Sequence, residues 1–176
     1  MDKTVVRNIR VWANVGLIGS LVMVVIAILF KYATKVAFYQ SPEVFRTLTI
    51  VAAVAVVLQT LFLLTSVRKG VPKLRQKDDV DEKLNGYASM VKTNGLCTMI
   101  ITALVSGIII LLGNYNLLML DMLLVLMLFF TYPNMYKIKV DLGLTDDQMT
   151  LLFGDQYVPD SEEETSEMED PLEKKK

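Results

Sequence analysis

The chain has 176 residues, of which 53% are hydrophobic, and it contains no histidine and a single cysteine, Cys97. Such an apolar composition, gathered in long runs, excludes an ordinary soluble domain. The absence of histidine and of a second cysteine excludes histidine-based metal sites and general bases, intramolecular disulfides and CxxC redox chemistry within this sequence.

Charge divides the chain into parts of opposite sign. Residues 1–140 contain 15 Lys and Arg against 7 Asp and Glu, a net of +8, whereas residues 141–176 contain 3 against 12, a net of −9. We expect a basic transmembrane domain over 1–140, a short cytoplasmic amphipathic segment over 141–159 and an acidic tail over 160–176. The tail has too few apolar residues to form a core, so it should be disordered.

Four apolar runs are long enough to cross a bilayer. The first, residues 11–30, contains no charged residue, and as a helix it would measure about 30 Å, the thickness of a hydrocarbon core. The others are residues 48–67, 96–113 and 117–136. These runs predict an all-α integral membrane protein whose four transmembrane helices form two hairpins.

Local signals predict where these helices begin and end. The second helix should stop at residues 68–72, which combine two basic residues, a glycine and a proline. The third should begin near Asp81, well before the membrane, because residues at helical spacing recur from Leu84 onward. Pro133 should lie in the last turn of the fourth helix or end it.

The Lys and Arg residues of the short loops predict the orientation. The basic connector between the hairpins, residues 68–94, carries seven, the N-terminal segment three and the start of the tail two, against three in the first loop on the other side. Twelve basic residues on one side of the membrane against three on the other predict that both termini and the connector are cytoplasmic. No small-residue cleavage pattern follows Phe30, so the first span should be retained, and the arrangement favours a bacterial inner membrane.

A short amphipathic helix is expected after the fourth span. Thr145 and Gln148 have the spacing of a capping box, and Gly154 would end the helix. Two turns are not stable alone in water, so the helix should lie on the membrane surface or on the base of the bundle. The two aspartates at its start would be repelled by anionic headgroups, which favours docking on the basic connector. The docking residues are expected to be Met149, Leu152 and Phe153.

Asp121 is the only charged residue inside a predicted span, roughly 6 Å below the outer boundary. One interpretation is a carboxylate that binds a proton or a cation. The other is an interfacial carboxylate that pairs with Lys31 or reaches headgroup water. We favour the second, because a charge near the edge of the bilayer needs no function to persist.

Uncharged polar and small residues predict how the helices pack. Gln59, Thr102 and Ser106 can form hydrogen bonds between helices, and small residues four positions apart let backbones approach closely. The small pairs are Gly16 with Ser20 and Ala103 with Gly107. The same residue types could line a substrate path, but no charge lies near the bilayer centre, so packing is the favoured interpretation.

Two functions from different classes remain. We expect a structural or interaction protein that docks a partner through its cytoplasmic connector and tail. The alternative is a subunit of an oligomeric small transporter or channel, because four short helices leave little room for a pore. An enzyme is not expected, since no phosphate-binding loop, nucleophile–base pair or metal-ligand spacing occurs. The expected partners are the lipid bilayer and a protein partner or further copies of the chain, with no cofactor and no nucleic acid.

Overall fold

The computed structural model describes residues 3–33 and 41–157, and that part of the chain contains helices and no β-strand. Three helices are long and apolar enough to cross a membrane, or four if one bent pair counts as a single span. In chain order the elements are α1 (Lys3–Ala33), α2 (Pro42–Thr65), η1 (Ser66–Gly70), α3 (Val71–Arg75), α4 (Val80–Leu112), α5 (Leu117–Phe130), α6 (Met135–Leu142), α7 (Asp146–Phe153) and η2 (Gly154–Gln156). The acidic tail expected to be disordered lies outside the described residues.

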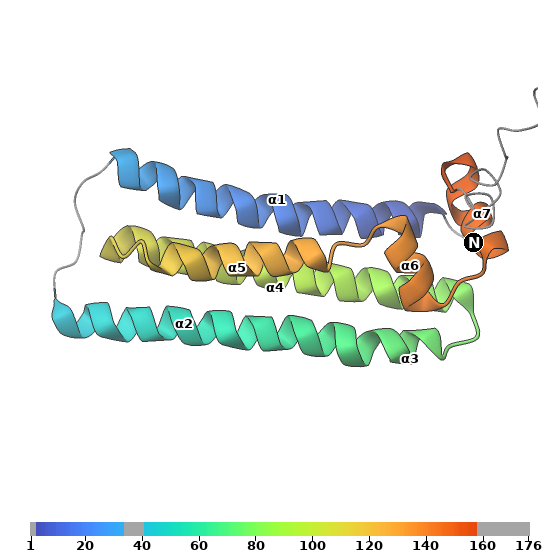
Figure 1. The fold of residues 1–176 in the computed structure, drawn as a ribbon, viewed down its shortest axis with the longest axis horizontal. Coiled ribbons are helices and arrows are strands. Elements are labelled where there is room, and N and C mark those ends of the chain that lie inside the picture. Colours follow the sequence, from blue (N-terminus) through green and yellow to red (C-terminus); the bar gives the residue numbers. More distant parts are fainter. Residues whose placement is uncertain (1–2, 34–40, 158–176) are drawn as a thin grey trace, which may run out of the picture.

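The long helices alternate in direction. In Figure 1, α1 and α4 run away from the end that carries the N-terminus, and α2 and α5 run back towards it, with α1 and α2 on opposite sides of the α4–α5 pair. α4 packs against α1, α2 and α5, so it is the central helix. At the far end the Asn114 side-chain amide donates a 3.4 Å hydrogen bond to the Thr49 hydroxyl. This bond joins the turn before α5 to the start of α2.

α4 is one uninterrupted helix. The Asp79 side chain accepts a hydrogen bond from the Asp81 amide at its start, and Gly113 ends it with a φ of 65°, which glycine adopts without strain. Its 33 residues measure about 50 Å, well beyond the thickness of a hydrocarbon core. The predicted early start of this helix is confirmed, and its first half can extend outside a membrane.

The second helix does not stop at residues 68–72 as predicted. After α2 the π-helical turn η1 leads directly into α3, so the chain remains helical to Arg75. Pro72 stands in the first turn of α3, where its missing amide hydrogen costs least. The wider π turn before it takes up the change in hydrogen bonding, so glycine, proline and two basic residues together do not end this helix.

The fourth span, predicted over 117–136, is broken. α5 ends at Phe130 after 14 residues, a length of about 21 Å, and α6 leaves it at an angle of 74°. Pro133 lies between the two helices, as expected of a residue that ends a helix. The Lys137 amine donates a 2.8 Å hydrogen bond to the Phe130 carbonyl oxygen, which satisfies one of the acceptors that a helix end leaves free.

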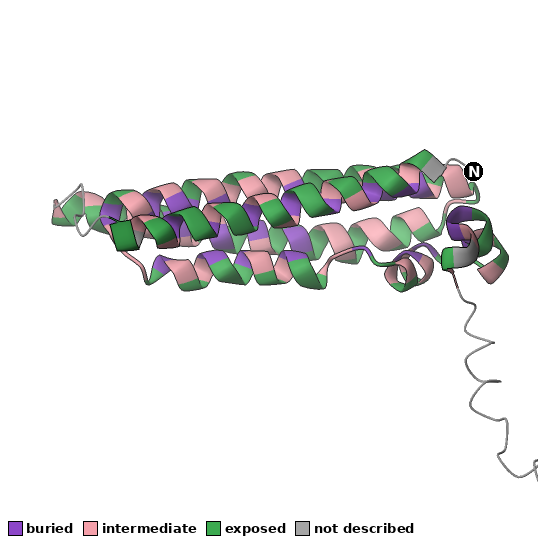
Figure 2. Ribbon diagram, turned by 90° about the horizontal axis from the view of Figure 1, so that it is seen from above, coloured by how far each residue is buried: buried purple, intermediate pink, exposed green. Residues whose placement is uncertain are grey.

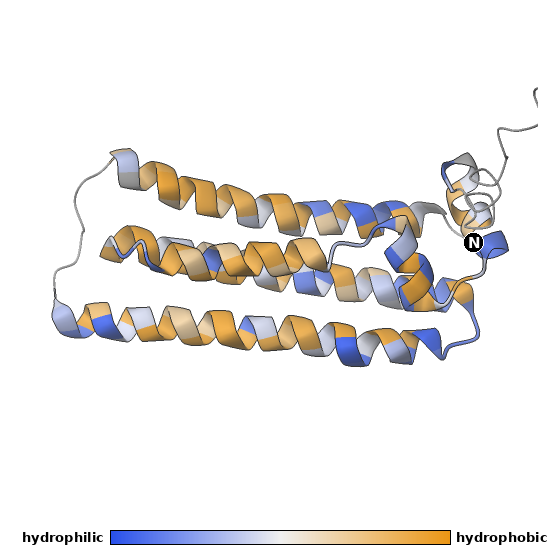
Figure 3. Cartoon of the chain, viewed as in Figure 1, coloured by the Kyte–Doolittle hydropathy of each residue, from blue (hydrophilic) through white to orange (hydrophobic). Residues whose placement is uncertain are grey.

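Two apolar cores hold the helices together. The base core joins the starts of α1 and α4 to α6 and α7; its buried members are Val6, Ile9, Leu84, Tyr87, Ile138, Leu142, Leu144, Met149, Leu152 and Phe153. The outer core joins α1, α2, α4 and α5 towards the other end; its buried members are Ala27, Ala52, Val56, Val105, Ile108, Ile109, Leu112, Leu117 and Leu124. Figure 2 shows buried residues on the inner faces of the long helices, and Figure 3 shows the hydrophilic ribbon gathered at the base end.

Candidate functional site

A row of polar side chains runs along the face of α4 that is turned into the bundle. Asn94, Thr98, Thr102 and Ser106 are four residues apart, so they lie above one another on one face of the helix. Each side chain is buried, with at most 6% of the residue exposed. We call this row the polar stripe; it leads from the base core into the outer core.

α2 joins the polar stripe through Gln59. The Gln59 side-chain amide donates a 2.9 Å hydrogen bond to the Thr98 hydroxyl, which donates a 2.8 Å bond to the Asn94 carbonyl oxygen on its own helix. Gln59 therefore bridges two helices as predicted, and its partner is Thr98, one turn nearer the base than Thr102. Side-chain hydrogen bonds between membrane helices contribute about 0.6–2 kcal/mol.

α5 joins the polar stripe through Asp121. The residue is fully buried, and its Oδ2 accepts a 2.7 Å hydrogen bond from the Ser106 hydroxyl. The Thr102 hydroxyl, one turn earlier on α4, also interacts with the carboxyl group but forms no well-oriented hydrogen bond. The expectation that Asp121 reaches headgroup water is wrong, because the packed helices cover it. The expected counter-ion, the Lys31 side chain, lies outside the described residues.

Four buried polar atoms in this interior have no hydrogen-bond partner among the described residues. They are Ser20 Oγ on α1, Asn94 Oδ1 and Thr102 Oγ1 on α4, and Asp121 Oδ1 on α5. Unpaired polar atoms are costly in an apolar environment, and buried ones are normally paired with protein, water or an ion. Because α1, α2, α4 and α5 each contribute a buried polar side chain, this interior is the candidate functional site.

α1 comes close to the polar stripe because two glycines face each other. A Cβ built on Gly16 would lie 2.6 Å from the Gly95 Cα, so the backbones of α1 and α4 touch at this point. Gly16 thus has the close-packing role predicted for it, and Ser20 lies buried one turn further along α1. The same prediction for Gly107 is wrong, since a Cβ there would meet no atom within 4 Å. Ala103, its predicted partner, is only half-buried.

A cavity of about 30 Å³ lies at the base end of the polar stripe. Its lining includes Asn94, Tyr87 and Asp141, and the Tyr87 hydroxyl donates a 2.9 Å hydrogen bond to the Asp141 carboxylate. The lining is mostly apolar, but the cavity is large enough for a water molecule, and Asn94, Tyr87 and Asp141 offer it polar partners. The polar stripe therefore ends, on the base side, at a space suited to water between α4 and α6.

α7 lies on the base of the bundle. Met149, Leu152 and Phe153 are buried in the base core, so all three predicted docking residues contact the chain itself. The Arg10 guanidinium lies 5.4 Å from the centroid of the Phe153 ring, a cation–π contact from the start of α1. The apolar face of α7 is therefore covered and is not free to bind a partner.

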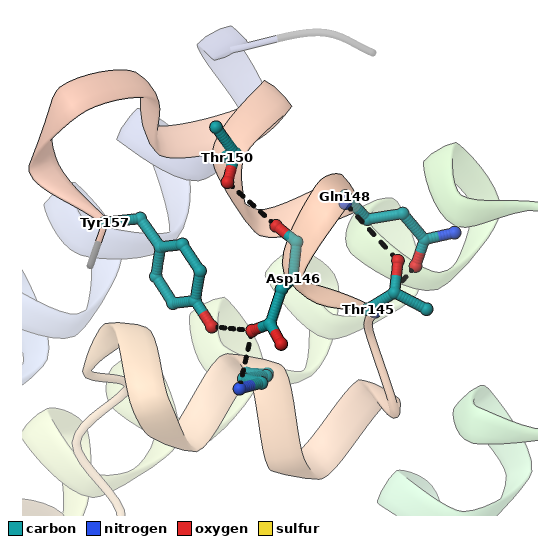
Figure 4. A network of polar contacts seen from close by, with 6 residues as sticks. Thr145, Asp146, Gln148, Thr150 and Tyr157 are labelled. Atoms are coloured by element: carbon teal, nitrogen blue, oxygen red, sulfur yellow. Dashed lines mark hydrogen bonds and ion pairs between the residues drawn. The ribbon is translucent and has the colours of Figure 1, made fainter. Parts of the chain in front are cut away.

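Polar contacts also hold α7 in place (Figure 4). The predicted capping box is confirmed: the Gln148 amide donates to the Thr145 hydroxyl, and the Thr145 amide donates to the Gln148 side chain. The Asp146 carboxylate lies 2.7 Å from the Lys139 amine and accepts a hydrogen bond from the Tyr157 hydroxyl. These contacts with Lys139 and Tyr157 lower the pKa of Asp146. Loss of water contact and the bond to Asp146 raise the pKa of Tyr157.

The chemistry available to the interior is that of hydroxyl, amide and carboxyl groups. Within the described ranges, no three His, Cys, Asp or Glu residues lie close enough together to hold a metal ion. Hydroxyls and amides donate and accept hydrogen bonds, and a carboxyl group also exchanges a proton. The arrangement can therefore connect helices, hold water and bind a proton.

Several contributors to the site do not stand out in the sequence. Asn94 continues the four-residue spacing of the threonines towards the base, and that spacing could have revealed it, although an Asn-Gly pair weakens the case for a helix there. The contact of Gly16 with Gly95 and the bond of Tyr87 to Asp141 join residues far apart in the chain. One sequence carries no signal that pairs them.

Comparison with known proteins finds no relative: no protein-family model, no curated protein and no solved structure matches this chain.

Proposed function

We propose that this chain is an interaction subunit of a bacterial inner membrane, with four spans and both termini in the cytoplasm. The distribution of Lys and Arg supports this orientation, because basic residues gather in cytoplasmic loops. The N-terminus, the basic connector and α7 lie together at the base end, whereas the turn before α5, which has no basic residue, lies at the other. The base end is then the cytoplasmic end.

The observation that carries the proposal is the base core. It brings together the starts of α1 and α4, the helices α6 and α7, and part of α3, which are far apart in the sequence. A chain that only crosses the bilayer needs no such core outside its transmembrane helices. Here α4 begins sixteen residues before its predicted span, about 24 Å at helical rise, and this extension supports a folded surface outside the membrane.

The surface offered to a partner is basic. Because the apolar residues of α7 are covered, a partner would have to bind elsewhere, and the connector exposes four cationic side chains on η1 and α3. They are Arg68, Lys69, Lys73 and Arg75, all exposed. A cluster of one sign attracts a surface of the opposite sign and sets the orientation of docking. The partner that fits is a protein with an acidic cytoplasmic surface.

Charge-neutralised variants test this proposal. The double variant Lys69→Gln/Lys73→Gln should lose the proteins that co-purify in mild detergent, while the protein still inserts and keeps its thermal stability. Arg46→Gln is the matched control, because it removes an exposed positive charge near the start of α2, at the other end of the bundle. Equal recovery of the same proteins with all three forms would contradict docking through the basic surface.

Truncation separates the tail from the folded base. Cutting at residue 140 would remove Leu142, Leu144 and three residues of α7 from the base core, so loss of function there would only report unfolding. A chain that ends at Tyr157 keeps α7, η2 and their contacts. If the acidic tail takes part in docking, this shorter truncation should change partner recovery without lowering the melting temperature.

A subunit of an oligomeric transporter or channel is the second candidate, and the polar stripe favours it. Unpaired buried oxygen and hydroxyl groups on three helices are common along ion and proton pathways. The discriminating measurement is flux in proteoliposomes. Gln59→Leu should abolish a flux that follows the polar stripe, whereas Thr60→Val should not, because the Thr60 hydroxyl bonds only to the Val56 carbonyl oxygen of its own helix.

A further inference from the structure

Asp121 is enclosed by stretches of helix that contain no charged residue in their sequence. It is fully buried where α5 packs on α4, and α5 also contacts α1 and α2. The stretches around it that contain no Lys, Arg, Asp or Glu are residues 11–30 of α1, 48–65 of α2 and 93–112 of α4. The only ionisable side chain in these stretches is that of Cys97 in α4, and Tyr115 lies in the turn before α5. No ion pair is formed by Asp121 within the part of the chain that the structure describes.

The hydrogen bonds around Asp121 are those expected of a protonated, uncharged carboxyl group. Ser106 donates to Oδ2, whereas Oδ1 is buried and unpaired. The Thr102 hydroxyl oxygen is buried and unpaired too, and it lies on the same face of α4 as Ser106. A proton on Oδ1 turns that atom into a donor, and Thr102 is the acceptor beside it. An ionised carboxylate in this place would have only the Ser106 and Thr102 hydroxyls beside it and no counter-ion among the described residues, which a low-dielectric interior strongly disfavours.

We propose that Asp121 is a proton-binding site that remains protonated at neutral pH and exchanges its proton through the polar stripe. The O–H bond forms at Oδ1 and the negative charge of the carboxylate is lost. The proton comes from a hydronium ion of the bulk solvent, whose O–H bond breaks to leave water. Asp121 binds this proton whether the chain is a docking subunit or part of a transporter.

The polar stripe supplies the route for this proton. Asn94, Thr98, Thr102 and Ser106 follow one another at a rise of roughly 6 Å, and each can accept and donate. At the base end the cavity beside Asn94 has room for water and is lined by Tyr87 and the Asp141 carboxylate. The route thus runs from a cavity with room for water and an acidic residue to a buried carboxyl group.

A proton fits this site better than a metal cation does. Three oxygen-bearing side chains meet here, those of Asp121, Ser106 and Thr102. Hard cations such as calcium and magnesium take six or more oxygen ligands. A proton needs one lone pair and no additional space, so the existing packing can hold it.

Infrared spectroscopy of the protein in lipid vesicles tests the site directly. At neutral pH the wild-type protein should show the carbonyl stretch of a protonated carboxylic acid, and Asp121→Asn should lack that band. Asp147→Asn, which removes an exposed carboxylate, should leave the band unchanged. The amide introduced by Asp121→Asn is a neutral donor and acceptor, so this variant should fold with a melting temperature at least equal to that of the wild type.

The route is tested by exchanging the vesicles into deuterium oxide and following the shift of the same band. Thr98→Val should slow this shift at least ten-fold, whereas Thr60→Val should not change it. An unchanged rate in Thr98→Val would overturn the route. Two results together would overturn the proton site in favour of a cation site. Asp121 would be ionised at neutral pH, and sodium would raise the melting temperature of the wild type but not that of Asp121→Asn. If Asp121→Asn fails to fold, solid-state NMR of wild-type protein with carbon-13-labelled carboxyl groups measures the protonation state of Asp121 directly.

Discussion

Gly16 on α1 and Gly95 on α4 meet backbone to backbone: a Cβ placed on Gly16 would lie 2.6 Å from the Gly95 Cα. The contact has the geometry by which small residues let membrane helices approach closely. It lies beside the base end of the polar stripe, so the position of α1 along α4 depends on it.

Gly16→Ala should therefore destabilise the protein by about 1–3 kcal/mol, the usual cost of an added methyl group in a close-packed site. The atom that it would meet belongs to the backbone, so no side-chain rotation can relieve the clash. Gly107→Ala is the control, because a Cβ at Gly107 meets no atom within 4 Å. Thermal unfolding in detergent, followed by circular dichroism, measures both. Equal melting temperatures for the two variants would contradict the close contact.

Gln59→Leu should lower stability by about 0.6–2 kcal/mol, because it removes the only hydrogen bond shown between α2 and the polar stripe in the described residues. Thr98 keeps its bond to the Asn94 carbonyl oxygen, so the loss should stay modest. Thr60→Val, which removes a bond within α2 itself, should change the melting temperature less. A larger effect for the control would mean that Gln59 does not connect the helices.

Met149→Ala should release α7 from the base core. Met149 is fully buried, and removing such a side chain typically costs about 2–5 kcal/mol. Hydrogen exchange should show protected amides over residues 148–153 in the wild type and faster exchange there in Met149→Ala. Leu151→Ala is the control on the same helix, because Leu151 is 65% exposed. Its protection should match that of the wild type, and equal, fast exchange in all three proteins would rule out a docked α7.

The contact of Asp146 with Lys139 and Tyr157 should depend on pH in a defined direction. The pKa of Asp146 is lowered by these two residues, so the stabilisation is present above the ordinary aspartate value of about 4 and is lost as the pH falls through the lowered pKa. In a carbon-13 NMR titration Asp146 should titrate below the ordinary aspartate value of about 4. Tyr157→Phe should move the titration of Asp146 upward; an unchanged midpoint in this variant would argue against the contact.

The parts of this fold that the sequence predicts are those governed by local rules. Apolar length predicts α1, α2 and α4, and the spacing of Thr145 and Gln148 predicts the cap of α7. The prediction that the second helix ends at residues 68–72 is wrong, because the π turn before Pro72 allows the helix to continue through the proline. Such an adjustment depends on tertiary packing rather than on the residues nearby.

The candidate site was less predictable because its contacts join different helices. Gln59, Thr102, Ser106 and Asp121 can be selected as polar residues within apolar runs, but depth along one helix does not show which side of it faces the bundle. The burial of Asp121 follows from the orientation of α5 on α4, and the rotation of one helix against another is set by packing. For the same reason the sequence assigns a close-packing role to Gly107, which the structure leaves on an open face.

The central claim is that the chain crosses the membrane four times, with the base end in the cytoplasm. Single-cysteine variants in a Cys97→Ser background test it in intact cells with a membrane-impermeant maleimide. Asn116 and Gln76 are both exposed. Asn116 directly precedes α5 and Gln76 directly follows α3, and these two points lie at opposite ends of the bundle (Figure 1). Asn116→Cys should be labelled from outside, and Gln76→Cys only after the cells are opened. Labelling of Gln76→Cys in intact cells, with Asn116→Cys protected, would reverse the orientation and contradict the account.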